Sequence, residues 1–253
     1  MRMTISEYLS DVLQDWRRSR NDFPKNEIKA PHWPMPFFGN PANALVATVG
    51  VNPASGEFED GRGWEDVKTG SEWKRRARDY FNQQALPHDW FDPWRIGLEL
   101  LGVSYEHRTA AHFDVSYRPT KAMIRNTTTD RREFGRMVER DVGWLFRLLP
   151  ICENLRLLLV FGPILRPDGS IGNLAHFLRN QAPQHGFTLT ELGNLQHTET
   201  GKLLVVHEAD TRNEKCVTCR VVKNLHTHRH ELRRLLEPTK RRSACDLTKK
   251  GNS

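Results

Sequence analysis

Short, continuous apolar runs constrain the fold of this chain more than any other feature of its sequence. Residues 44–50 (ALVATVG) and 155–162 (LRLLLVFG) both end at a glycine, and residues 203–207 (LLVVH) form a third run. A run of this length is typical of a strand buried on both faces of a parallel sheet. Residues 110–116 (AAHFDVS) add a less apolar candidate. The sequence therefore predicts four strands in a buried sheet.

Stretches with helical spacing separate these runs. Apolar residues recur at helical spacing in residues 5–16, 133–149 and 222–236. Further helical stretches are expected at residues 71–81, which are highly charged, at residues 93–101, which are more apolar, and at residues 170–180, where Ser170 is a candidate cap. Strands that alternate with helices predict an α/β fold, here a three-layer α/β/α arrangement around a central, mainly parallel four-stranded sheet. Residues 187–192 are a further strand candidate outside that set.

The length of 253 residues suits one large α/β domain with its own core. We expect residues 1–237 to form that single domain, starting with an N-terminal helix. Residues 54–108 are expected to be a long insertion after the first strand. The basic residues 238–253 are expected to form a disordered tail.

Composition and charge exclude several classes of protein. No run of 18 apolar residues occurs, and Glu7 and Asp11 interrupt the first apolar stretch, so we expect neither a membrane span nor a signal peptide. Four scattered cysteines make no disulfide framework, which favours the cytoplasm. The formal net charge of +7 points to a polyanion such as nucleic acid as the partner of a monomeric protein.

Polar side chains stand at or near the carboxyl ends of three predicted strands. Asn52 follows the first strand, Asp114 lies in the second, and His207 ends the last. Because ligands of parallel α/β sheets bind at this edge, the three residues are candidates for one site. Taken singly, each has a plainer explanation: a turn at Asn52, a surface carboxylate at Asp114, and a hydrogen-bonded core histidine at His207.

Taken in order, these segments resemble the uracil-DNA glycosylase superfamily. Residues 36–41 (PFFGNP) and 47–55 (ATVGVNPAS) are similar to its first motif, a strand that ends in Gly-x-Asn-Pro. Asp114, Gly162 and His207 match the ends of the later strands, and the resemblance spans residues 36–236. The family often has His-Pro-Ser where this chain has His207-Glu-Ala.

The resemblance implies a monofunctional DNA glycosylase, which hydrolyses the N-glycosidic bond of a flipped-out pyrimidine and leaves an abasic site. Asn52 would orient the attacking water, and His207 would donate a hydrogen bond to O2 of the departing base. Phe58, or alternatively Trp64, would stack on the flipped ring, and Asp114 would read the base edge. No cofactor or metal is required.

Asp114 departs from the asparagine that uracil readers of this superfamily commonly use. An ionised carboxylate only accepts hydrogen bonds, so it suits the exocyclic amine of cytosine better than O4 of uracil. We therefore expect a cytosine-derived, 5-modified base, in DNA repair or in antiviral defence against phage DNA. Two alternatives stay open: a uracil or mismatched-thymine glycosylase in base excision repair, and a non-catalytic module that binds modified DNA.

Basic residues after the second strand and in the last loop are candidates for contacts with DNA phosphates. They are Arg118, Lys121, Arg125 and Arg212. Cys216 and Cys219 precede three histidines, but the spacing Cys-x2-Cys-x6-His-x-His-x-His is not that of a standard zinc finger, so no metal site is expected.

Overall fold

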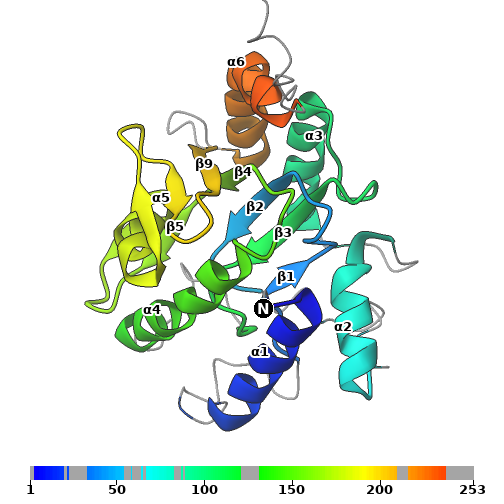
Figure 1. The fold of residues 1–253 in the computed structure, drawn as a ribbon, viewed down its shortest axis with the longest axis vertical. Helices are drawn as coiled ribbons and strands as arrows, with labels where there is room; N and C mark the ends of the chain where they lie inside the picture. The colour runs from blue at the N-terminus through cyan, green and yellow to red at the C-terminus, as the bar shows by residue number, and fades with distance from the viewer. Residues whose placement is uncertain are drawn as a thin grey trace, which may run out of the picture.

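A seven-stranded sheet runs through the centre of the protein in this computed structural model (Figure 1). The structure describes residues 3–19, 22, 33–53, 58, 64, 67–82, 87, 89–120, 131–209 and 216–237. The strands, in spatial order, are β1 (Phe37–Phe38), β3 (Ala110–Asp114), β2 (Val46–Gly50), β4 (Leu157–Val160), β9 (Leu203–Glu208), β8 (Leu195–His197) and β7 (Phe187–Leu189).

The four middle strands are the predicted parallel ones. β3, β2, β4 and β9 pair in parallel, whereas β1 at one edge and β8 and β7 at the other are antiparallel. The prediction of a four-stranded sheet was therefore wrong in its strand number. The strands at Phe37–Phe38 and Leu195–His197 were missed because two or three residues carry no readable period.

Six α-helices accompany the sheet in the described part of the chain: α1 (Ile5–Ser19), α2 (Gly70–Arg78), α3 (Asp92–Leu101), α4 (Arg131–Leu148), α5 (Leu174–Gln181) and α6 (Val217–Leu236). Short 3-10 turns occupy Tyr80–Asn82, Asp89–Phe91 and Ala182–His185. The predicted helix at residues 170–180 is wrong in its first turn. There β5 (Pro163–Leu165) and β6 (Ile171–Asn173) form a hairpin, and the Asn173 side chain caps α5.

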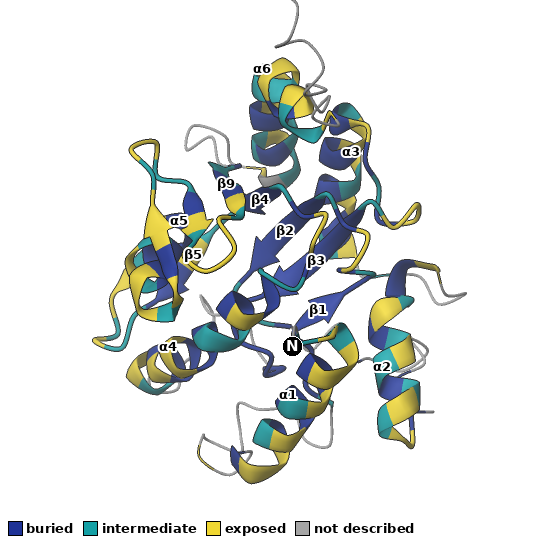
Figure 2. Ribbon diagram, viewed as in Figure 1, coloured by how far each residue is buried: buried dark blue, intermediate teal, exposed yellow. Residues whose placement is uncertain are grey.

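Both faces of the middle strands are covered. Every residue of β2, β3 and β4 is buried, which explains why these strands are continuously apolar (Figure 2). α3 and α6 lie together on one side of the strands, with α1 and α4 on the other (Figure 1). Gly97 permits the close approach of α3 to α6, since an added Cβ would lie 2.5 Å from Leu225.

None of the helices in the described ranges has the length and apolar character needed to cross a membrane. The predicted tail, residues 238–253, lies outside the described residues.

α4 offers a matched test of its packing against the β5–β6 hairpin. A Cβ at Gly135 would lie 2.0 Å from the backbone oxygen of Arg166, whereas a Cβ at Gly143 would lie 3.2 Å from the His185 ring. We expect Gly135→Ala to lower the free energy of unfolding by about 1–3 kcal/mol through overpacking. Gly143→Ala should be near neutral, because a gain of about 1 kcal/mol in helix propensity offsets the tight contact with the His185 side chain. Equal urea midpoints for the two variants would contradict this packing.

Candidate functional site

The order of the parallel strands fixes where a ligand site can form. The chain passes from β2 to β3 on one side and then returns to β4 on the other side of β2. In sheets of this kind, ligands bind outside the carboxyl ends of the two strands where the direction switches. Asn52 lies two residues after the end of β2, so it lies at that switch point.

Asn52 and Asp114 belong to neighbouring strands and reach the same edge. Asp114 is the last residue of β3 and pairs with Gly50, the last residue of β2. Beyond the strands, the chain segments stay together, because Ser116 N donates to Val51 O at 2.8 Å. The prediction that Asn52 and Asp114 lie at the same edge of the sheet is therefore confirmed.

The side-chain amide of Asn52 is held in one orientation. Its Nδ2 donates to Pro53 O at 3.0 Å, to Arg118 O at 3.3 Å and to Thr120 Oγ1 at 2.7 Å. Two of these acceptors are carbonyl oxygens, which only the NH2 end can face. The half-buried Asn52 thus turns Oδ1 away from them, and no partner for that oxygen occurs among the described residues.

Asp114 is a buried carboxylate with one oxygen unused. Its Oδ1 lies 3.4 Å from His112 Nε2. Its Oδ2 is buried and has no hydrogen-bond partner in the described part of the chain. Burial raises the pKa of Asp114, and the neighbouring His112 opposes that rise. A buried oxygen without a donor is costly, so this atom is suited to a ligand that brings one.

Gly50 keeps space beside these groups. A Cβ at this position would lie 3.0 Å from His112 Nε2 and 3.1 Å from Asp114 Oδ1. A larger residue would therefore push against both polar side chains. Glycine at the end of the first predicted strand is therefore explained by the lack of space for a Cβ.

His207 is placed less favourably than the sequence suggested. It pairs with Leu159 and so is level with Thr48, below the strand ends, and β9 lies about 10 Å from β2. Its Nε2 lies 2.7 Å from Asn224 Oδ1, and Asn224 Nδ2 donates to Glu208 O. Because Oδ1 only accepts, Nε2 carries the proton and donates it to Asn224.

That hydrogen bond uses the N–H that His207 was predicted to offer to a base. The ring also packs edge-on against His228, with centroids 5.0 Å apart. Burial lowers the pKa of His207, which favours the neutral ring. Its role toward a departing base stays a prediction, and in this structure it would need to release Asn224 first.

The predicted stacking rings are both buried. Phe58 is 5% exposed, and its ring centroid lies 5.4 Å from that of Trp64. Trp64 in turn stacks near Tyr80 at 6.4 Å. In this structure the two rings pack against each other in the core and present no open platform for a base.

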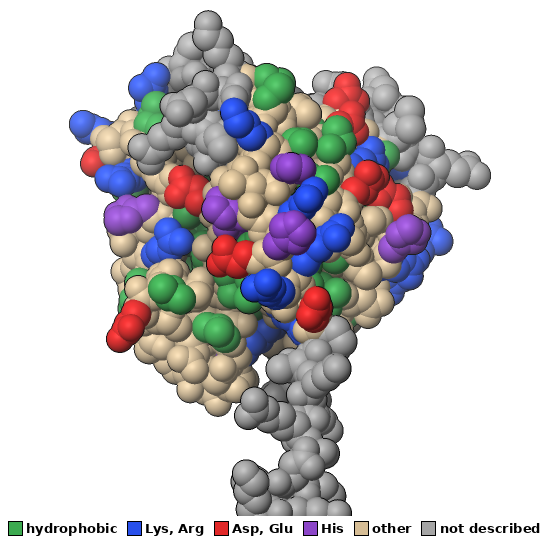
Figure 3. Space-filling model, turned by 90° about the horizontal axis from the view of Figure 1, so that it is seen from above, with side chains coloured by type: hydrophobic (Ala, Val, Ile, Leu, Met, Phe, Trp, Pro, Cys, Tyr) green, Lys and Arg blue, Asp and Glu red, His purple; other side chains and the backbone are tan. Residues whose placement is uncertain are grey.

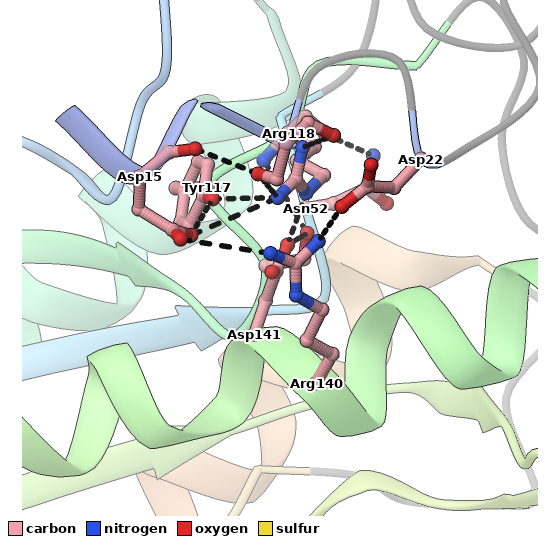
Figure 4. Close-up of polar contacts among 9 residues, drawn as sticks. Asp15, Asp22, Asn52, Tyr117, Arg118, Arg140 and Asp141 are labelled. Atoms are coloured by element: carbon pink, nitrogen blue, oxygen red, sulfur yellow. Dashed lines mark hydrogen bonds and ion pairs between the residues drawn. The ribbon is translucent and has the colours of Figure 1, made fainter. Parts of the chain in front are cut away.

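Arg118 was predicted to contact a DNA phosphate, but its side chain lies inside the protein. Its side chain has no exposed surface. The guanidinium donates from Nε to Asp141 Oδ2 at 2.9 Å and from Nη2 to Ser19 Oγ and the Tyr117 hydroxyl, each at 2.6 Å (Figure 4). The expectation that Arg118 grips DNA is therefore wrong for this conformation. Lys121, Arg125 and Arg212 lie outside the described residues.

The Arg118–Asp141 pair was not predicted from the sequence. Both side chains are fully buried, and Asp141 Oδ2 also accepts from Ser116 Oγ at 2.6 Å. Burial raises the pKa of Asp141 to about 6, against the opposing effect of the Arg118 guanidinium. A signal was present, since Asp141 interrupts the buried face of α4 between Val138 and Leu145.

This pair fixes the segment that holds Asn52. Ser116 and Arg118 are both tied to Asp141 of α4, and the Arg118 guanidinium also reaches Ser19 of α1. The backbone oxygen of Arg118 accepts from Asn52. The orientation of the Asn52 amide therefore depends on the buried Arg118–Asp141 ion pair, to which it is connected through the backbone of Arg118.

Basic side chains are available elsewhere on the surface. Within α6, five Lys or Arg residues stand against one acidic residue. Lys, Arg and His side chains lie among acidic ones on the face seen from above the α6 end of Figure 1 (Figure 3). Positive and negative side chains are therefore mixed on this face (Figure 3).

Metal ligands do not gather in the described part of the chain, where no group of three or more His, Cys, Asp or Glu side chains could hold an ion. Cys216 and Cys219 are exposed at the start of α6.

Comparison of the sequence with protein-family models and with curated proteins finds no match.

The buried ion pair can be tested with a double-mutant cycle. Arg118→Met leaves the Asp141 carboxylate buried alone, and Asp141→Leu leaves the guanidinium alone. Each single variant should lose about 3–5 kcal/mol of unfolding free energy, and the double variant should lose less than either one. Denaturant unfolding measures all three. Losses that simply add would show that the two groups do not act as a pair.

Proposed function

We propose that this protein is a monofunctional DNA glycosylase, similar to the uracil-DNA glycosylase superfamily and with that family's three-layer α/β/α arrangement. It would hydrolyse the N-glycosidic bond of a flipped-out pyrimidine and leave an abasic site. The observation that carries the proposal is the pairing of Asn52 and Asp114 at the carboxyl edge of β2 and β3, next to the switch point. Asn52 Oδ1 and the buried Asp114 Oδ2 each have no hydrogen-bond partner among the described residues.

Asn52 would orient the attacking water. Its NH2 group is bound to Pro53 O, Arg118 O and Thr120, so the amide can offer only Oδ1, which is an acceptor. A water that donates one O–H to Oδ1 would keep a lone pair free to attack the sugar carbon. An amide is not a general base, so its contribution is positioning. The sugar cation that develops gains further stabilisation from the phosphates of the bound DNA.

Asp114 would read the edge of the base. A carboxylate accepts from the exocyclic amine of a cytosine-type base, whereas it repels O4 of uracil or thymine. This favours a cytosine-derived base, of the 5-modified kind, over plain uracil. Repair and defence against modified phage DNA are both compatible with that chemistry.

Two alternatives have an observation in their favour. Burial raises the pKa of Asp114, and a protonated carboxyl group would pair with uracil or mismatched thymine. The N–H of His207 is bonded to Asn224, which favours a non-catalytic module that binds an altered base without cutting it. Base release and base preference, measured in variants of Asn52 and Asp114, separate these alternatives.

Replacing Asn52 tests catalysis. Asn52→Ala should reduce single-turnover base release by about 100-fold or more, because the water loses its orienting acceptor. Binding of the same duplex should persist, since an amide that orients the attacking water is not needed to hold the DNA phosphates. Thr120→Val, which removes one of the three anchors of Nδ2, should give a smaller loss. Unchanged base release in Asn52→Ala would eliminate the proposed role.

Replacing Asp114 tests base reading. In Asp114→Asn, the new NH2 group can donate to O4, so the preference should move from cytosine-type toward uracil-type bases by about 5- to 150-fold. The measurement is the ratio of initial release rates from matched oligonucleotides. An unaltered ratio would mean that another residue reads the base.

A further inference from the structure

Four polar side chains form a buried chain beneath the carboxyl edge of the sheet. The Tyr105 hydroxyl lies 2.5 Å from Thr48 Oγ1, and Thr48 Oγ1 lies 2.8 Å from His112 Nδ1. His112 Nε2 then faces Asp114 Oδ1 at 3.4 Å. All four residues are at least 97% buried, so each proton in the chain needs a partner inside the protein.

Counting those protons fixes their direction. Among the described residues, the Tyr105 hydroxyl contacts only Thr48, so it must donate to Thr48 Oγ1. The Thr48 hydroxyl must then donate to its other partner, His112 Nδ1. A nitrogen that accepts carries no proton, so the single N–H of His112 is on Nε2, facing Asp114.

The reverse order leaves a buried donor unpaired. If Asp114 donated to His112, Nδ1 would donate to Thr48 and Thr48 to Tyr105. The Tyr105 proton would then have no acceptor among the described residues. An unsatisfied buried donor costs about 1–3 kcal/mol, which disfavours this order.

Aromatic side chains hold the His112 ring in place. Its centroid lies 4.9 Å from that of Trp90, 5.3 Å from Phe91 and 6.1 Å from Phe38. A ring packed in this way cannot turn over to exchange its nitrogens without disturbing the core. The direction of the chain is therefore built into the fold.

We propose that His112 is a specificity-determining residue that holds Asp114 as a hydrogen-bond acceptor, so that the site selects a base offering an N–H, the exocyclic amine of a cytosine-type base. The N–H of His112 aimed at Oδ1 favours the carboxylate over the acid. Oδ2 is buried and has no partner among the described residues, so it would meet a ligand as an acceptor only. The identity of the ligand rests on the proposed glycosylase function. The proton order in the buried chain does not depend on that function.

The proton order can be measured without any substrate. Nitrogen-15 NMR of the full chain labelled at histidine distinguishes the two tautomers, and His112→Gln identifies the His112 signals by their loss. We expect the Nε2–H tautomer, with Nδ1 as a hydrogen-bond acceptor. An Nδ1–H tautomer, or a doubly protonated ring at neutral pH, would overturn the inference whether or not the protein cuts DNA.

Selectivity can be measured without cleavage. Oligonucleotides that carry one 2′-fluoro-deoxycytidine or 2′-fluoro-deoxyuridine resist glycosidic hydrolysis, because fluorine destabilises the sugar cation. The wild-type protein should bind the cytidine form about fivefold or more tightly than the uridine form. Equal affinity for the two, or a uridine preference, would overturn the inference even if the protein proves to be a glycosylase.

A matched pair of variants assigns the selectivity to His112. His112→Phe keeps a ring in the aromatic packing but removes the N–H, so the cytidine preference should fall to about unity. Phe38→Leu disturbs the packing on His112 and leaves its nitrogens intact, so the preference should persist. If His112→Phe does not fold, His112→Gln retains a donor and should retain the preference. A cytidine preference that survives in His112→Phe would overturn the inference.

Discussion

A charged pair with no contact to solvent sets the geometry on which the rest of the site depends. Arg118 and Asp141 are both completely buried, and together they tie α4 and α1 to the segment that follows β3. Such a pair contributes little net stability compared with apolar residues, yet losing one partner is expensive. Its value here is positional, because the backbone of Arg118 holds the amide of Asn52.

The sheet supplies the other half of the site. Burial of both faces of β2 and β3 leaves their carboxyl ends as the place where polar groups can meet a ligand. Strand pairing brings Asp114 level with Gly50, and the following residues bring Asn52 beside the loop after β3. Two residues 62 positions apart in the chain thus share one edge for reasons of backbone pairing alone.

The parallel strands could be predicted because their signal is continuous apolarity, as in residues 155–162. The edge strands could not, because a strand such as Phe37–Phe38 is defined by its partner and not by its own pattern. The same limit applied to the site. Asn52 and Asp114 could be found from their positions at strand ends, whereas the burial of Arg118 depends on Asp141 of a distant helix.

The surroundings of His207 and Phe58 could not be predicted from motif order. The strand that carries His207 was predicted, but the hydrogen bond that occupies its ring comes from Asn224 of α6, which no local pattern indicates. Phe58 lies near the first motif in sequence and packs against Trp64. A residue's distance along the chain from a motif says little about whether its side chain faces a ligand.

In the proposed function, Asn52 and Asp114 act together on one extruded nucleobase. The most direct measurement is mass spectrometry of the bases freed from oligonucleotides that contain uracil, mismatched thymine or 5-substituted cytosines. We expect a free 5-substituted cytosine and an alkali-labile abasic site in the same strand. Intact strands and no free base from any of these substrates would contradict it.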